Sequence, residues 1–458
     1  MPDTGSEGDR MMVASPMAKA EAGWVVRRSA AILLGFLLLA MPSRAADWQP
    51  LREAMVGLVT GPEAPVSGVA VIVVRDGKTV FAQAAGRAVI DPTNPTRERP
   101  LTLDTPVRVA SLSKLPVGIA VHQLAAAGKL DLDADLSPLL GFRLRNPHHP
   151  DHPITTRMLL THTSSLRDAE IYGLPPPYSL EELVRPGGAF DPGGTRWADE
   201  VPGTRFTYTN LNYGVMATLI ERLTGQRFDA VVTTQVLRPL GMRAAYDVRL
   251  LDVDRFQQLA PVYRRQPDGS WLATVDDYQG RRPDDRLTIF GVKALVPLAH
   301  IVPGRNGTSL SPQGGMRASA RDLAMLLHFL LDRGGGLLPA TAFDRMLTPH
   351  WTYDPAVGNG DVDGGLLRQW ALGIHCTTHG GGPGAGDRWQ AGAKDPRLCG
   401  HFGDAYGLLG AVMADPGGRW GFVYLLTGTP MIRVTGPVSS LTVWEQTVVD
   451  GILAGVNS

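Results

Sequence analysis

A serine and a lysine stand three residues apart at Ser111 and Lys114. Serine is a weak nucleophile unless a neighbouring base takes its proton, and a lysine one helical turn away lies on the same face as the serine. To act as that base, the amine must be partly neutral, which requires burial or nearby positive charge. By chance this spacing occurs about once in a chain of this length, so an N-capping serine beside a solvated lysine is the alternative.

Two further polar stretches follow in the chain. Tyr208 can share a proton with Lys114, and Asn210 can bind both Lys114 and a substrate amide. The alternative for this pair is a turn tyrosine and an N-capping asparagine. His401 and Gly403 precede a strand-forming run. A backbone N–H just after them can pair with that of Ser111 to form an oxyanion hole.

These residues need helices and strands to position them. Apolar residues that recur at helical spacing, together with glycines that end the pattern, predict helices. Apolar runs separated by turn residues predict hairpins. The helices are expected at 112–128, 155–160, 211–223, 321–331 and 441–453, and the hairpins at 66–85 and 407–427. Loops with short strands are expected over 261–315.

The strands therefore cluster at both chain ends, with helices between them. The economical arrangement is an α/β fold of the α+β type, in which an antiparallel sheet is built from both ends, flanked by helices, and carries an inserted, mostly helical lobe. The sheet lobe is expected at about 50–110 and 315–458, and the helical lobe at about 111–314. A substrate site is expected between the two lobes.

The N-terminus has the pattern of a secretory signal. Arg27 and Arg28 precede an apolar run at 29–41, and small residues follow at 42–46. As a helix this run reaches only ~20 Å, against a hydrocarbon core of ~30 Å, so no stable membrane anchor is expected. We predict a signal peptide at 1–46, a mature domain at 47–458, and export to the periplasm.

Composition limits the partners and the redox chemistry. The 458 residues carry 44 basic and 44 acidic side chains, which argues against a nucleic-acid partner. The cysteines are Cys376 and Cys399. In an exported protein they are expected to form a disulfide, which would contribute about 3 kcal/mol. Free thiols, or a zinc site with nearby histidines, are the alternatives.

Several segments together resemble one family. Residues 107–114 followed by 128–133 resemble the serine β-lactamase-related family, which includes class C β-lactamases, some DD-peptidases and related esterases. Residues 158–166 and 314–323 resemble two more of its characteristic segments. The similarity extends from about residue 66 to 426.

The resemblance implies a role for each candidate residue. Ser111 would be the acylated nucleophile and Lys114 its general base, with Tyr208 acting as a base or proton relay. Asn210 would position the substrate amide. His401 and Gly403 would belong to the third catalytic motif of the family, after those of Ser111 with Lys114 and Tyr208 with Asn210. This motif would lie on an inner strand, and no metal or organic cofactor would be required.

One departure bears on the substrate. His401 stands where class C β-lactamases have a lysine, and a histidine is mostly uncharged near neutral pH. Penicillin binding should therefore be weak, which favours the esterase and peptidase branches. His379 is a second candidate for the third motif.

The sequence predicts a serine hydrolase that acts on an ester or amide of the cell envelope. Its substrate would be a small molecule or peptidoglycan-like. Esters, D-Ala peptides and β-lactams all remain open as substrates. The alternative is a catalytically silent peptidoglycan-binding protein of the same fold.

Overall fold

The computed structural model describes residues 46–61, 64–289, 292–382, 384–392 and 395–458. The predicted signal segment falls almost wholly on residues 1–45, which lie outside this part of the chain. Within the described ranges, none of the helices has both the length and the apolar character needed to cross a bilayer. Export and the boundaries of the two lobes stay predictions.

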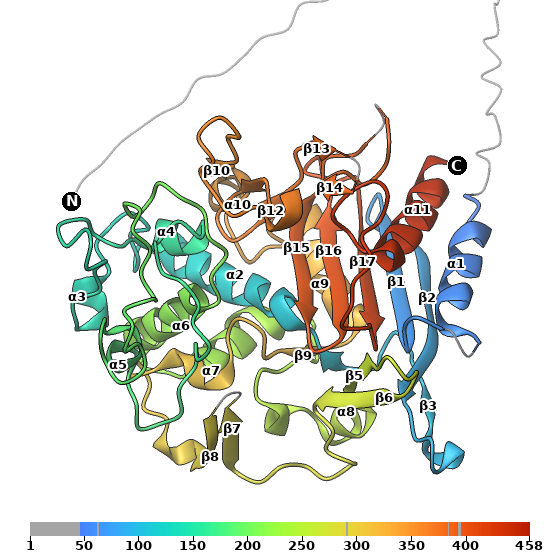
Figure 1. Cartoon of the computed structure of the whole chain (residues 1–458), viewed down its shortest axis with the longest axis horizontal. Helices are drawn as coiled ribbons and strands as arrows, with labels where there is room; N and C mark the ends of the chain where they lie inside the picture. Colours follow the sequence, from blue (N-terminus) through green and yellow to red (C-terminus); the bar gives the residue numbers. More distant parts are fainter. Residues whose placement is uncertain (1–45, 62–63, 290–291, 383, 393–394) are drawn as a thin grey trace, which may run out of the picture. The chain divides into compact units, whose positions relative to one another are not determined.

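Strands from both ends of the chain form one antiparallel sheet, as predicted (Figure 1). Over the described residues the order of its strands is β10 (Trp351–Thr352), β11 (Gln369–Trp370), β12 (His375–Cys376), β15 (Cys399–Ala405), β16 (Leu408–Ala414), β17 (Trp420–Thr427), β1 (Gly68–Arg75), β2 (Lys78–Val89) and β3 (Arg99–Pro100). The two chain ends meet where β1 pairs with β17, with Gly68 opposite Thr427.

Each face of the sheet is buried by its own layer of helices. Successive side chains of a strand point to opposite faces. On β1, Val71 and Val73 belong to the apolar cluster with α1 (Gln49–Val59) and α11 (Val443–Asn457). Ile72 and Val74 belong to the cluster with α2 (Lys114–Ala126) and α9 (Ala320–Leu331). Because both faces are covered, β1 is apolar along nearly its whole length.

The middle of the chain is mostly helical, and Figure 1 shows it beside the sheet on the side of α2. Its helices are α3 (Ser137–Leu140), α4 (Thr156–Leu160), α5 (Leu180–Val184), α6 (Leu211–Thr224), α7 (Phe228–Val232) and α8 (Val253–Gln258). Two small hairpins follow, as expected for 261–315: β5 (Val262–Arg265) with β6 (Trp271–Val275), and β7 (Arg286–Ile289) with β8 (Val292–Pro297). A short ladder between β4 (Val107–Arg108) and β9 (Arg317–Ala318) ties the start of this region to its end.

Helix α1 is not among the helices predicted from the sequence. A helix of 11 residues is marginal by itself and depends on tertiary packing. Here α1 packs closely on α11, where a Cβ added to Gly451 would lie 2.8 Å from the Cα of Leu51. The contact that stabilises α1 therefore comes from the opposite end of the chain.

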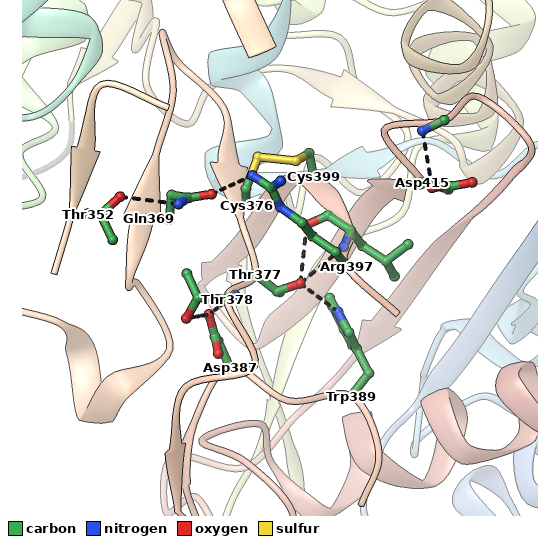
Figure 2. The surroundings of a disulfide bond; sticks show 12 residues. Thr352, Gln369, Cys376, Thr377, Thr378, Asp387, Trp389, Arg397, Cys399 and Asp415 are labelled. Atoms are coloured by element: carbon green, nitrogen blue, oxygen red, sulfur yellow. Dashed lines mark hydrogen bonds between the residues drawn. A yellow bond between two sulfur atoms is a disulfide. The ribbon is translucent and has the colours of Figure 1, made fainter. Parts of the chain in front are cut away.

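The predicted disulfide is confirmed. Cys376 and Cys399 are directly opposed residues of the neighbouring strands β12 and β15, and their sulfurs are bonded (Figure 2). Beside the bond, the Thr377 hydroxyl accepts hydrogen bonds from the Leu398 N–H at 3.0 Å and from the Trp389 indole N–H at 3.3 Å. The bonded sulfurs are not free thiolates, so the alternatives of free thiols and of a zinc site that uses them do not apply.

Removing this bond should destabilise the fold. The cysteines are 23 residues apart, and closing a loop of that size contributes about 3 kcal/mol through the unfolded state. We expect the double variant Cys376→Ser with Cys399→Ser to lose about that much free energy of unfolding, measured by urea denaturation at neutral pH. Wild type unfolded with a reductant present should show the same loss. An unchanged urea midpoint would contradict the prediction.

Candidate active site

Ser111 lies in a single 3-10 turn, η2 (Ala110–Ser113), which leads directly into α2. The sequence predicted an α-helix from residue 112, so the first turn is tighter than expected. In a 3-10 turn, side chains three apart eclipse each other, which brings Lys114 over Ser111. The Nζ of Lys114 lies 2.9 Å from the Oγ of Ser111. Ala110, just before the serine, has a left-handed φ of +49°, and such strained conformations cluster at functional sites.

The Lys114 side chain is completely buried. Its Nζ lies 2.7 Å from the Oδ1 of Asn210 and 2.9 Å from the carbonyl oxygen of Gln313, in addition to its contact with Ser111. Burial lowers the pKa of Lys114 to about 7, and the charge of Asp168 opposes this shift. A substantial fraction of the amine is therefore neutral at physiological pH, as a general base requires.

Tyr208 lies beside the same amine. The Nζ of Lys114 is 5.0 Å from the centre of the Tyr208 ring. Burial raises the pKa of Tyr208 well above its usual value, although a hydrogen bond with the Ser111 side chain opposes the shift. The phenol therefore keeps its proton at neutral pH.

His162 holds the segment that carries Tyr208. The two rings stack with their centres 4.5 Å apart. The Nδ1 of His162 accepts the Thr209 N–H at 3.1 Å, and its backbone carbonyl accepts the Thr207 N–H at 2.8 Å. Burial lowers the pKa of His162 well below its usual value, so the ring is neutral. These contacts are those of a scaffold for Tyr208.

Asn210 precedes α6 but does not cap it. Its backbone is helical, with φ −67° and ψ −35°, and its side chain makes no capping hydrogen bond. Asp168 accepts from the N–H of Leu211 at 2.9 Å instead, and from the N–H of Asn210 at 2.8 Å. The alternative interpretation of Asn210 as an N-cap is therefore wrong. The capping acceptor comes from 43 residues earlier in the chain.

The end of β15 passes directly beside the serine turn. A Cβ added to Gly403 would lie 2.8 Å from the carbonyl oxygen of Val109 and 2.9 Å from the Cγ of Leu112. Only a glycine allows this approach without displacing the turn. The backbone of β15 therefore comes close to Ser111, where an oxyanion hole would have to form.

His401 is on the same strand, but its ring is only 2% exposed. The ring centre lies 6.3 Å from that of Tyr208, and the Nδ1 of His401 donates to the Phe402 carbonyl at 2.6 Å. Burial and the charge of Lys114 lower the pKa of His401 to about 3, so the ring is neutral. His379, the other candidate, precedes the small hairpin β13 (Gly381–Gly382) to β14 (Ala385–Gly386) and lies near Asp395.

The structure thus brings together Ser111, Lys114, Tyr208 and Asn210, with Gly403 and His401 adjacent to them. Sequence reasoning missed two contributors, Asp168 and Gln313. Gln313 contributes its main-chain carbonyl, which no side-chain pattern can reveal. Asp168 is 42 residues from Asn210, so no local spacing links them.

One family model and several known proteins are similar to this chain in sequence. A family model described as beta-lactamase matches residues 51–436. Esterase EstB of Burkholderia gladioli is 32% identical over 288 residues, which is 60% of this chain and 68% of EstB. Protein flp of Staphylococcus aureus is 27% identical over 182 residues, 39% of this chain and 34% of flp.

Solved structures agree on the fold. The octameric penicillin-binding protein homologue from Pyrococcus abyssi superposes with a TM-score of 0.60 at 20% identity, covering 88% of this chain and 76% of the other. The D-amino acid amidase from Ochrobactrum anthropi, complexed with D-phenylalanine, has a TM-score of 0.59 at 20% identity, covering 89% and 99% of the two chains. At these identities the likeness shows the fold alone.

Proposed function

Because this chain belongs to the beta-lactamase family and has the serine hydrolase fold of that family, we propose that it is an exported hydrolase that forms an acyl-enzyme on Ser111. The observation that carries the proposal is the Ser111–Lys114 pair, with 2.9 Å between Oγ and Nζ and a lysine pKa near 7. Its substrate would be an ester or amide of the cell envelope.

The surroundings of Lys114 support its role as the base. A neutral amine has two N–H bonds and one lone pair. The oxygens of Asn210 and Gln313 only accept hydrogen bonds, at 2.7 and 2.9 Å, and so take the two N–H bonds. The lone pair is then directed at the Ser111 hydroxyl. As Oγ attacks the substrate carbonyl, its proton passes to Nζ, and backbone N–H groups of Ser111 and the end of β15 would stabilise the oxyanion.

Tyr208 is suited to relay that proton. Its phenol is protonated in the resting site and forms a hydrogen bond with Ser111. It can therefore give its proton to the leaving group while it accepts a proton from Lys114. This completes the acyl-enzyme. In the second half of the reaction, the same two groups would take a proton from water and return one to Ser111.

The third motif favours uncharged substrates. His401 is neutral and buried, and Arg433 forms an ion pair with Asp404, the residue after Gly403. A substrate carboxylate would therefore find no ammonium at the position where class C β-lactamases have a lysine. The similarity to an esterase supports the same preference.

A kinetic comparison of substrates tests this proposal. We expect kcat/KM for p-nitrophenyl esters to exceed that for nitrocefin and for D-Ala-D-Ala peptides by about 100-fold, which is what a missing charge pair of about 3 kcal/mol amounts to. A fluorophosphonate should add one adduct to wild type and none to Ser111→Ala, measured by intact mass. Equal adducts on both proteins, or faster hydrolysis of nitrocefin, would contradict the proposal.

A further inference from the structure

Asp168 forms hydrogen bonds with Asn210, the residue whose side chain contacts Lys114. Its Oδ2 accepts the Asn210 N–H at 2.8 Å and the Asn210 Nδ2–H at 2.9 Å, and its Oδ1 accepts the Leu211 N–H at 2.9 Å. Burial raises the pKa of Asp168, but all three partners are donors and favour the ionised carboxylate, which opposes that rise. Asp168 thereby connects the start of α6 to the amide that contacts Lys114.

We propose that Asp168 is a positioning residue that determines which atom of the Asn210 amide faces Lys114, and so directs the lysine lone pair at Ser111. The proposal rests on the proposed function, because it concerns the same Ser111–Lys114 pair.

The chemistry of the two side chains carries the argument. An amide group presents an acceptor on one side and a donor on the other, and a half-turn exchanges them. A carboxylate can only accept, so the Nδ2 of Asn210 must face Asp168. The Oδ1 must then face Lys114, at the observed 2.7 Å.

The opposite orientation of the amide would disable the base. With Nδ2 turned towards Lys114, a donor would face the amine, and the lone pair of neutral Lys114 would accept from Asn210. The Ser111 hydroxyl would then lose its proton acceptor. Only one orientation of Asn210 is therefore compatible with the proton transfer from Ser111.

Asp168 also contributes charge. Other groups that face Lys114 are neutral: burial raises the pKa of the phenols of Tyr208 and Tyr213, and it lowers that of the imidazoles of His162 and His401. The carboxylate of Asp168 is the charge that raises the pKa of Lys114 against its burial. Removing that charge should therefore let the lysine lose its proton at lower pH.

The test is the variant Asp168→Asn, which keeps the size of the side chain and removes both the charge and the acceptor-only character. We expect kcat/KM for a p-nitrophenyl ester to fall by about 100-fold, the contribution of a correctly placed general base. The acidic limb of its pH profile should move to lower pH by about one unit. A purely structural role would lower activity without this shift, and loosening of the site would hydrate Lys114 and move the limb upwards.

A second variant restores the geometry. In Asp168→Asn with Asn210→Asp, residue 210 can only accept, so an oxygen faces Lys114 whichever way it turns. On the alkaline plateau of the pH profile, where Lys114 is neutral, we expect kcat/KM to recover by about tenfold over the single variant, because the lone pair is again free for Ser111. The new charge beside Lys114 should move the acidic limb above that of wild type. The acidic limb of the double variant is compared with that of wild type, so this readout does not require the single variant to fold.

Asp191 offers a matched control. It is also a buried carboxylate in a loop of the helical region, where it accepts from the N–H groups of Thr195 at 2.8 Å and Arg196 at 3.3 Å. Asp191→Asn should leave the position of the acidic limb unchanged. If wild type hydrolyses esters and Asp168→Asn matches it in rate and pH profile, the inference is wrong and the proposed function stands. If wild type itself forms no adduct on Ser111, the proposed function fails first.

Discussion

Replacement of Ser111 by alanine is expected to lower kcat/KM for a p-nitrophenyl ester by about 10⁴-fold or more. The hydroxyl supplies the atom that forms the acyl bond, and no neighbouring group can replace it. Losses of this size follow removal of a nucleophile that acts as a unit with its base. Residual hydrolysis would come only from the oxyanion-stabilising groups and substrate binding.

The fold should not be affected by this change. Ser111 is partly exposed, and its hydroxyl contacts Lys114 and Tyr208 rather than the apolar core. The unfolding midpoint of Ser111→Ala should therefore lie close to that of wild type. Ser113→Ala is an instructive comparison, because the Ser113 hydroxyl bonds to the Ala110 carbonyl at 2.6 Å and to the Met316 N–H at 3.0 Å. That variant should lose stability and keep the acyl-enzyme. If Ser111→Ala retained more than a tenth of the wild-type activity, the mechanism would be wrong.

Lys114→Arg is expected to lower kcat/KM by about 10³-fold, within the range that general-base catalysis contributes. A guanidinium stays protonated at every accessible pH and cannot take the proton of Ser111. In wild type, kcat/KM should rise as pH increases through about 7, because Lys114 becomes neutral with a pKa of about 7. The variant should lack this rise.

Lys129→Arg serves as the control for the lysine. Lys129 is exposed, just beyond the end of α2, so its replacement should leave both rate and pH profile unchanged. Initial rates with a p-nitrophenyl ester between pH 5 and 9 measure both variants. A wild-type profile without an inflection near pH 7, or an arginine variant with near-normal activity, would contradict the assignment of Lys114 as the base.

Much of the fold could be predicted because its signals are local. The apolar alternation of β1 and the helical spacing that ends near Gly225 are written in neighbouring residues, and they predicted β1 and α6 nearly to their ends. The spacing of Ser111 and Lys114 is also local, since one turn joins them. The order of the motifs along the chain predicted the family, which the comparisons confirm.

Contacts between distant segments could not be predicted in this way. Residue types alone indicated that Tyr208 and Asn210 could serve Lys114, but only the packing of α6 against α2 sets the 2.7 Å contact across 96 residues. Asp168 had no signal, because acidic residues are common in loops and its partner is 42 positions away.

The sequence by itself determined the chemistry available to this protein: a serine, a lysine one turn later, a tyrosine, an asparagine, and a histidine in place of the lysine of the third motif. Tertiary structure decided how that chemistry is tuned. Burial, which depends on every element that packs around Lys114 and His401, lowers the pKa of the first to about 7 and that of the second to about 3. Desolvation is a property of the whole assembled site, so no spacing along the chain encodes it.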